Sequence, residues 1–178
     1  DTGLLYRAVA LVLWRWGGDA GNVFEALRAA RELNFDPADE ELRSETVGQW
    51  ASAVSAYPAV REALLERQQA FAALPGGAVL DGRDIGTVIA PGARVKLYVT
   101  AAPEVRARRR LAELEGRGMS AHFDEVLADI TARDERDRDR AAAPLIQAED
   151  AILLDTSDLD KDAAIAAAIR LAEKRLKA

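Results

Sequence analysis

The sequence predicts an α/β fold in which helices cover a parallel β-sheet. Three short apolar runs rich in branched residues, at 78–81, 94–100 and 151–155, are expected to be strands. The helices expected around them span 103–115, about 121–141 and about 160–176. Strands that alternate with helices favour a parallel sheet covered on both faces, and ligands of such sheets bind beyond the carboxyl ends of the strands.

The residues before the first predicted strand are expected to be largely helical. The segment "LLYRAVALVLWRWGG" is apolar on nearly every side, which predicts a buried helix that ends at Gly17–Gly18. A second helical pattern covers 23–33, and "YPAVREALLERQQAF" predicts a third helix with an inner stripe of Val60, Leu64 and Phe71. The intervening "NFDPADEELRSETVG" breaks the periodicity and is interpreted as a loop-rich insertion.

Composition narrows the possible functions. The chain has 24 Lys and Arg against 30 Asp and Glu, a net charge of −6, which disfavours general binding to nucleic acid or to an anionic membrane. No apolar run approaches the ~20 residues of a membrane span. With no cysteine and one histidine, thiol catalysis, cysteine-based zinc sites and histidine-rich metal clusters are excluded. The lack of cysteine fits a reducing cytoplasm, and His122 is expected to lie on the surface.

Eight consecutive charged residues, "RDERDRDR", occupy 133–140. The apolar stripe before them consists of Phe123, Val126, Leu127 and Ile130. Steps of three and four residues continue this stripe to Arg133, Asp137 and Arg140, so these side chains are expected to face inward, toward a polar cavity. The alternative is an ordinary helix surface with ion pairs such as Asp134–Arg138. Both interpretations stay open on geometry alone.

Other arginines stand at positions suited to an anion. In "GRDIGT", Arg83 and Asp84 follow a predicted strand and are flanked by glycines that allow close backbone approach. Arg7 comes about one helical turn after Thr2, near helix N-terminal amides that favour an anion. Arginine forks bind phosphates in a planar, bidentate way. Several such segments converging on one cleft predict a site for a phosphate-rich ligand.

The chain resembles the bacterial cytidylate (CMP) kinase family in "DTGLLYRAVA", "LRSETVG", "ASAVSAYPAVREALLERQQAF", "VLDGRDIGTVI", "KLYVTAAPEVRARRR" and "ITARDERDRDRAAAPL". The match runs over nearly the whole chain. It implies a P-loop nucleoside-monophosphate kinase fold in one domain over 1–178, with a short monophosphate-binding insertion over 34–57 and an arginine-bearing lid over 106–140. It also implies a cytoplasmic monomer that transfers the γ-phosphate of ATP to CMP or dCMP, with Mg²⁺ bound together with ATP.

By this resemblance, Ser52, Arg61 and Asp84 would read the cytosine base. A guanidinium fork with hydroxyl and carboxylate partners can pair with the cytosine edge. A base with another donor–acceptor pattern would leave buried polar groups unpaired.

The resemblance also implies which residues surround the phosphates. Arg7 and Arg83 would hold the acceptor phosphate with Thr2 beside it, Asp81 would lie near the transferring groups, and Arg140 would contact the phosphates. The acceptor phosphate is already an anion, so no general base is required. Catalysis then consists of positioning and of charge neutralisation by arginine and magnesium.

The lid residues receive roles in the same way. Arg133 and Asp137 would contact the sugar of the nucleotide. Arg106, Arg109 and Arg110 would open the lid segment and face the ATP side. The charged run is thereby expected to be a clamp on its inner face and ordinary surface on its outer face.

Two departures from the family pattern stand out. The segment "LNFDPADEELRSETVG" lacks the strand-forming hairpin of many relatives. The family pattern also places a first strand and a Gly-x-x-x-x-Gly-Lys-Ser/Thr phosphate loop before "DTG", and no such loop occurs in the 178 residues. We therefore expect an N-terminally truncated kinase that does not turn over ATP by itself at a useful rate.

Alternatives remain at this point. The chain could belong to a kinase for another monophosphate, such as UMP, dCMP or AMP, or for another small acceptor. It could also be a non-catalytic nucleotide-binding module, or an acidic structural protein without a ligand. Ranking the affinities for CMP, UMP and AMP would distinguish the first group, and a thermal shift with CMP would exclude the last.

Overall fold

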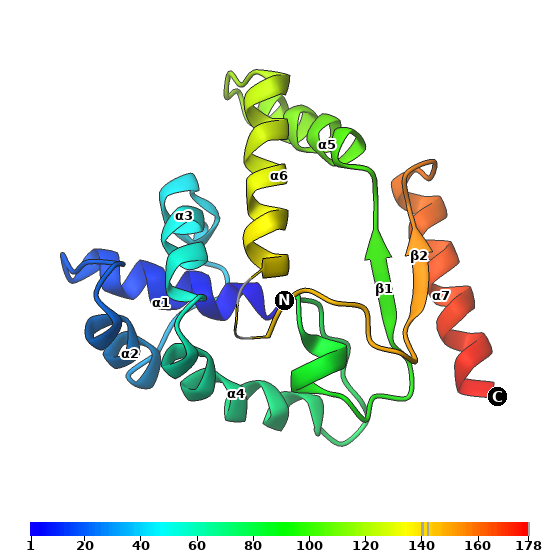
Figure 1. The fold of residues 1–178 in the computed structure, drawn as a ribbon, viewed down its shortest axis with the longest axis horizontal. Coiled ribbons are helices and arrows are strands. Elements are labelled where there is room, and N and C mark those ends of the chain that lie inside the picture. Colours follow the sequence, from blue (N-terminus) through cyan, green and yellow to red (C-terminus); the bar gives the residue numbers. More distant parts are fainter. Residues whose placement is uncertain (140, 142, 178) are drawn as a thin grey trace. The chain divides into compact units, whose positions relative to one another are not determined.

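A computed structural model describes residues 1–139, 141 and 143–177 (Figure 1). The described residues form two compact units, one of residues 1–90 with 141 and 143, the other of residues 91–139 and 144–177. Within the described ranges, no helix is both long enough and apolar enough to cross a membrane.

The first unit is helical. Its elements are α1 (Gly3–Arg15), α2 (Val23–Arg31), the 3₁₀-helix η1 (Glu40–Arg43), α3 (Glu45–Val54), α4 (Pro58–Ala72) and the π-helical turn η2 (Ile85–Ile89). Helix α1 packs against α2 and α3, and α2 packs against α4 (Figure 1). Five residues in the middle of α1 are at most 2% exposed: Ala8, Val9, Ala10, Leu11 and Leu13. The prediction of a buried first helix is therefore confirmed.

Local sequence signals account for where these helices begin and end. The Asn22 side chain accepts hydrogen bonds from the backbone N–H groups of Phe24 and Glu25, which caps α2. Helix α1 ends at Arg15, and Gly17, two residues later, has a φ of +69° in the left-handed region that favours glycine. The backbone N–H groups of Gly17 and Gly18 donate to Trp14 O at 2.9 Å and Leu13 O at 3.0 Å, which completes a Schellman motif at the Gly-Gly pair.

The segment interpreted as a loop-rich insertion carries more structure than expected. Glu40–Arg43 forms η1, and α3 begins at Glu45, where the Ser44 side chain accepts from the backbone N–H of Val47 at 3.3 Å. Leu42 and Val47 are 0% and 2% exposed. The expectation of a loop was wrong for this part, because its few apolar residues are buried against the core that α1 provides.

The inner face of α4 differs from the predicted stripe at its last member. Val60 and Leu64 are fully buried, as expected, but Phe71 is 51% exposed. The buried residue of the last turns is Gln68, at 3% exposure. Gln68 lies seven residues after Arg61, so the two side chains share one helix face.

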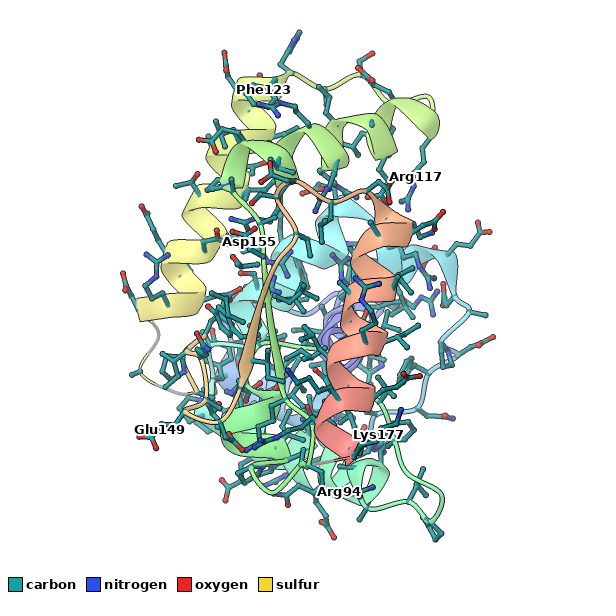
Figure 2. All side chains as sticks on the ribbon, turned by 90° about the vertical axis from the view of Figure 1, so that its right-hand side faces the viewer. Arg94, Arg117, Phe123, Glu149, Asp155 and Lys177 are labelled. Atoms are coloured by element: carbon teal, nitrogen blue, oxygen red, sulfur yellow. The ribbon has the colours of Figure 1, made fainter. Side chains whose placement is uncertain are left out.

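The second unit contains a two-stranded parallel sheet and three helices. Strand β1 (Leu97–Thr100) pairs with β2 (Ile152–Asp155) in a register that sets Leu97 opposite Ile152. Helices α5 (Pro103–Gly116) and α6 (Phe123–Asp139) pack against each other. Helix α7 (Lys161–Lys177) runs back along β2, with Asp155 and Lys177 at the two ends of that path (Figure 2).

The predicted strand at 78–81 does not form, and β1 is shorter than the predicted 94–100. Extended apolar residues become a strand only when a neighbouring strand completes the hydrogen-bond ladder. At 78–81 the backbone instead meets the start of α1, since the Thr2 N–H donates to Asp81 O at 3.0 Å. Val79 is 93% exposed.

A charged pair joins the two segments that lead into the strands. Lys96 Nζ lies 2.8 Å from both carboxylate oxygens of Asp150, and the Lys96 side chain is only 8% exposed. The hydrogen bond from Lys96 lowers the pKa of Asp150 below its usual value. Because the pKa is lowered, the pair stabilises the folded state at pH values above the ordinary carboxyl pKa of about 4. This stabilisation is lost as the pH falls through the lowered pKa of Asp150.

We expect the carboxyl titration of Asp150, followed by NMR, to shift to higher pH in a Lys96→Met variant. Asp155 is a matched control, because the Ser157 side chain lowers its pKa without involving Lys96. Its titration should not move. An unchanged Asp150 midpoint would contradict the pairing.

Candidate functional site

A buried ion pair forms the centre of the candidate site in the first unit. Arg61 on α4 pairs through Nη2 with Asp84, the residue just before η2, and their side chains are 10% and 6% exposed. Arg61 Nη1 also donates to Ser55 O at 3.2 Å. Its guanidinium carbon lies 5.3 Å from the centre of the Tyr6 ring. A buried charge is tolerated when it is paired and hydrogen-bonded, and both conditions hold here.

An open hollow of about 190 Å³ lies beside this pair, and Tyr6, Arg61, Gln68 and Asp84 contribute to its lining together with apolar residues of α4 and η2. The carboxamide of Gln68 donates through Nε2 to Leu64 O at 3.1 Å. Its Oε1 is buried and has no hydrogen-bond partner among the described residues. Sequence reasoning missed both Tyr6 and Gln68, although the seven-residue spacing from Arg61 was a usable signal for Gln68.

The loop before η2 meets the start of α1. Thr2 Oγ1 donates to Asp81 O at 2.9 Å, and a Cβ at Gly82 would lie only 2.2 Å from Thr2 Oγ1. Gly82 is therefore required for this approach. Asp81 and Arg83 have exposed side chains. Two segments about 80 residues apart in the sequence thus lie together, with polar groups of both at one place.

Arg7 projects from α1 toward the start of α3. Its Nη1 donates to Leu42 O at 2.9 Å and to Ser44 O at 3.3 Å. Ser52 lies in the second half of α3, and its carbonyl accepts from Ser55 Oγ at 3.0 Å. Because Arg61 is held by Ser55 O, the end of α3 is connected to the buried pair.

The arginines of α5 have partners within the second unit. Arg106 forms a two-point pair with Asp134 on α6 and donates through Nε to Ala101 O at 3.0 Å. The hydrogen bond to Asp134 raises the pKa of Arg106. Arg109 donates to Thr156 O at 2.6 Å and to Leu159 O at 2.9 Å. These two arginines join α5 to α6 and to the loop that follows β2.

The remaining arginine of this group, Arg110, pairs with Glu113 at 2.9 Å, and Arg117 pairs with the same carboxylate from the other side. The hydrogen bond from Arg110 lowers the pKa of Glu113. These are pairs three and four residues apart between partly exposed side chains, of the kind that contributes little to stability.

The charged run on α6 follows the predicted inward stripe only in part. Asp137 is 9% exposed, and its carbonyl accepts from Leu145 N at 2.7 Å, whereas Arg133 is exposed. Asp134 pairs with Arg106 across two helices, in place of the suggested pair with Arg138. Because Arg133 has an exposed side chain, its inward orientation stays a prediction. Arg140 lies outside the described residues.

The second unit and the first therefore each carry part of the predicted residue set. Thr2, Arg7, Ser52, Arg61, Asp81, Arg83 and Asp84 lie in the first unit. Arg106, Arg109, Arg110, Arg133 and Asp137 lie in the second. Among the described residues, no three histidine, aspartate or glutamate side chains are grouped so as to hold a metal ion.

Comparison with known proteins gives one consistent result. A family model described as cytidylate kinase matches residues 1–174. The chain is 56% identical over 177 residues to a cytidylate kinase of Xanthobacter autotrophicus, covering 98% of this chain and 84% of that protein. It is 56% identical over 173 residues to a cytidylate kinase of Paramagnetospirillum magneticum, covering 95% and 82%. A cytidylate kinase of Rhodopseudomonas palustris strain BisB5 is 56% identical over 176 residues, covering 97% and 82%.

Proposed function

Because this chain belongs to the cytidylate kinase family, we propose that it acts in the transfer of the γ-phosphate of ATP to CMP or dCMP, which yields CDP or dCDP and ADP. The observation that carries the proposal is the buried Arg61–Asp84 pair beside an open hollow. We also propose that the enzyme is a cytoplasmic monomer. The first unit supplies the CMP side of the reaction.

Recognition of cytosine rests on a matched set of donors and acceptors. The carboxylate of Asp84 is an acceptor for the exocyclic amino group, the guanidinium of Arg61 is a donor for the ring edge, and the hydroxyl of Ser52 can serve either role. Uracil carries a carbonyl where cytosine carries the amino group, which would set an acceptor against the Asp84 carboxylate. Such a mismatch leaves buried polar groups unpaired and is strongly disfavoured.

The phosphate of CMP is assigned to the arginines near the start of α1 and the loop before η2. Arg7 and Arg83 would neutralise it, with Thr2 beside it and Asp81 near the transferring groups. The attacking phosphate oxygen carries a negative charge already, so these residues orient it and need not remove a proton. Mg²⁺ bound together with ATP supplies charge neutralisation at the transferring phosphate.

In the second unit, Arg133 and Asp137 are proposed to contact the sugar and Arg140 the phosphates. Arg106, Arg109 and Arg110 are proposed to lie on the ATP side of the lid. Arg106 and Arg109 hold α5 in place through Asp134 and Thr156, so their proposed contribution to ATP includes positioning this helix. No Gly-x-x-x-x-Gly-Lys loop occurs in the 178 residues, so no residue of this chain is assigned to the loop that cradles the ATP phosphates.

The proposal is tested by calorimetric binding of CMP, UMP and AMP to the 178-residue polypeptide. We expect CMP to bind at least tenfold more tightly than UMP or AMP, a difference of about 1.4 kcal/mol. Uracil has no amino donor for the Asp84 carboxylate, and adenine lacks the second acceptor, the C2 carbonyl of cytosine, that the Arg61 guanidinium would meet. A Ser52→Ala variant should bind CMP more weakly. Ser55→Ala is the matched control, since its backbone carbonyl, which holds Arg61, is retained.

Equal affinities for the three nucleotides would contradict recognition of cytosine and favour a kinase for another monophosphate. Binding of none of them would contradict the assignment of the CMP side to the first unit. A similar loss of affinity in Ser52→Ala and Ser55→Ala would remove Ser52 from the base site.

A further inference from the structure

A glycine stands in the interior of α3, at Gly48. Glycine is among the poorest helix formers because it loses the most backbone entropy on folding. The flanking residues of α3 give no local reason for it. The Ser44 side chain caps the helix at its start, and the helix continues past Gly48 to Val54. The reason must therefore come from what lies against the helix at this position.

The guanidinium of Arg7 occupies that space. A Cβ added at Gly48 would lie 3.1 Å from Nη2, 3.3 Å from Nη1 and 3.5 Å from Cζ of Arg7. The first two distances are shorter than ordinary van der Waals contacts, for which about 3.5–4.0 Å is optimal between heavy atoms. The missing side chain of Gly48 thus leaves room for the group that Arg7 carries.

The guanidinium cannot move away without cost. Its Nη1 donates to Leu42 O and Ser44 O, both in the turn that leads into α3. The group is consequently held by two carbonyls while it lies against the bare backbone of Gly48. A displacement of a few tenths of an ångström would lengthen these hydrogen bonds and tilt the plane of the fork.

We propose that Gly48 is a positioning residue for substrate binding: the absence of a side chain at this position sets where the Arg7 guanidinium lies relative to the phosphate of the nucleoside monophosphate. The inference rests on the proposed function, in which Arg7 holds that phosphate. It adds a residue that never touches the substrate and acts only through Arg7. Planar, bidentate binding of phosphate by arginine is sensitive to small shifts and tilts of the fork.

The test compares Gly48→Ala with the unaltered polypeptide in binding of CMP and of cytidine, which lacks the phosphate. We expect Gly48→Ala to weaken CMP binding by about tenfold, the equivalent of roughly one charge-assisted hydrogen bond, while cytidine binding stays the same. A purely structural role would weaken both ligands alike. The thermal midpoint of Gly48→Ala should not fall in parallel with its CMP affinity, because alanine favours the helix.

Gly116→Ala is the matched control, because Gly116 is also helical and a Cβ there would meet nothing within 4 Å. It should leave binding of both ligands unchanged. A second control places Gly48→Ala in an Arg7→Met background, where the substitution should cause no additional loss of CMP binding. Additive losses in this double-mutant cycle would overturn the inference.

The outcomes separate the inference from the function on which it rests. If the unaltered polypeptide does not prefer CMP to cytidine, the proposed role of the first unit in phosphate binding fails. If it does prefer CMP and Gly48→Ala retains that preference in full, only the role of Gly48 fails. If Gly48→Ala does not fold, the Arg7→Met/Gly48→Ala double variant decides the question. Folding of the double variant supports a clash between the alanine side chain and the Arg7 guanidinium. Failure of the double variant to fold as well overturns the inference.

Discussion

Asp84→Asn is expected to destabilise the first unit by about 3 kcal/mol, because it leaves the Arg61 guanidinium buried without a counter-charge. Removing one partner of a buried ion pair typically costs about 3–5 kcal/mol. We expect the lower end, since the Ser55 carbonyl and the Tyr6 ring still face the guanidinium. Urea unfolding followed by tryptophan fluorescence measures this directly, because Trp14, Trp16 and Trp50 all lie in the first unit.

The surface pair Arg28–Glu32 provides the matched control. Its side chains are 68% and 54% exposed and lie one helical turn apart on one helix, with the same chemistry of a single carboxylate and guanidinium. Glu32→Gln should cost no more than about 0.5 kcal/mol. If Asp84→Asn were as mild as Glu32→Gln, burial would not be what makes the Arg61–Asp84 pair important.

A double replacement separates the contribution to stability from the contribution to binding. An Arg61→Met/Asp84→Leu variant removes both charges and should recover most of the stability lost in Asp84→Asn, because apolar groups of similar size often replace a buried ion pair at little cost. It should not recover CMP binding. Recovery of both would mean that the pair serves the fold alone.

Leu42→Ala is expected to lower the free energy of unfolding of the first unit by about 2–5 kcal/mol. Leu42 is fully buried, and its removal leaves a cavity between η1 and the core around α1. The backbone carbonyl that accepts from Arg7 is retained, so the loss is one of packing. The same tryptophan signal in urea reports the change.

Leu74→Ala is the control for this substitution, since the Leu74 side chain is 48% exposed and the chemistry of the change is identical. It should cost less than about 1 kcal/mol, because little apolar area returns to water. Equal losses for Leu42→Ala and Leu74→Ala would show that η1 is not part of the core.

The helices of both units were largely predictable because their signals are local. Asn22 and the Gly17–Gly18 pair fix helix ends through hydrogen bonds to residues no more than five positions away. The expected helix over 103–115 is observed as Pro103–Gly116, and the one over about 160–176 as Lys161–Lys177. The residue motifs likewise indicated the family that the comparisons establish.

Other features required the tertiary structure, because their partners are distant in the sequence. The apolar run at 78–81 has the composition of a strand, but its Asp81 carbonyl accepts from the backbone N–H of Thr2. The inner face of α4 buries Gln68 where periodicity predicted Phe71. Asp134 stands one helical turn before Arg138 on its own helix, and it pairs with Arg106 on another.

The sequence by itself therefore determined the helices, their caps and the residues with the right chemistry for a phosphate-bearing ligand. Which of these residues meet was decided only by the packing of elements: Arg61 with Asp84, Thr2 with Asp81, and Arg7 with the bare backbone of Gly48. The physical reason is that a cap or a turn is completed within a few neighbouring residues, whereas the partner of a buried charge is selected by whichever segment the fold brings against it.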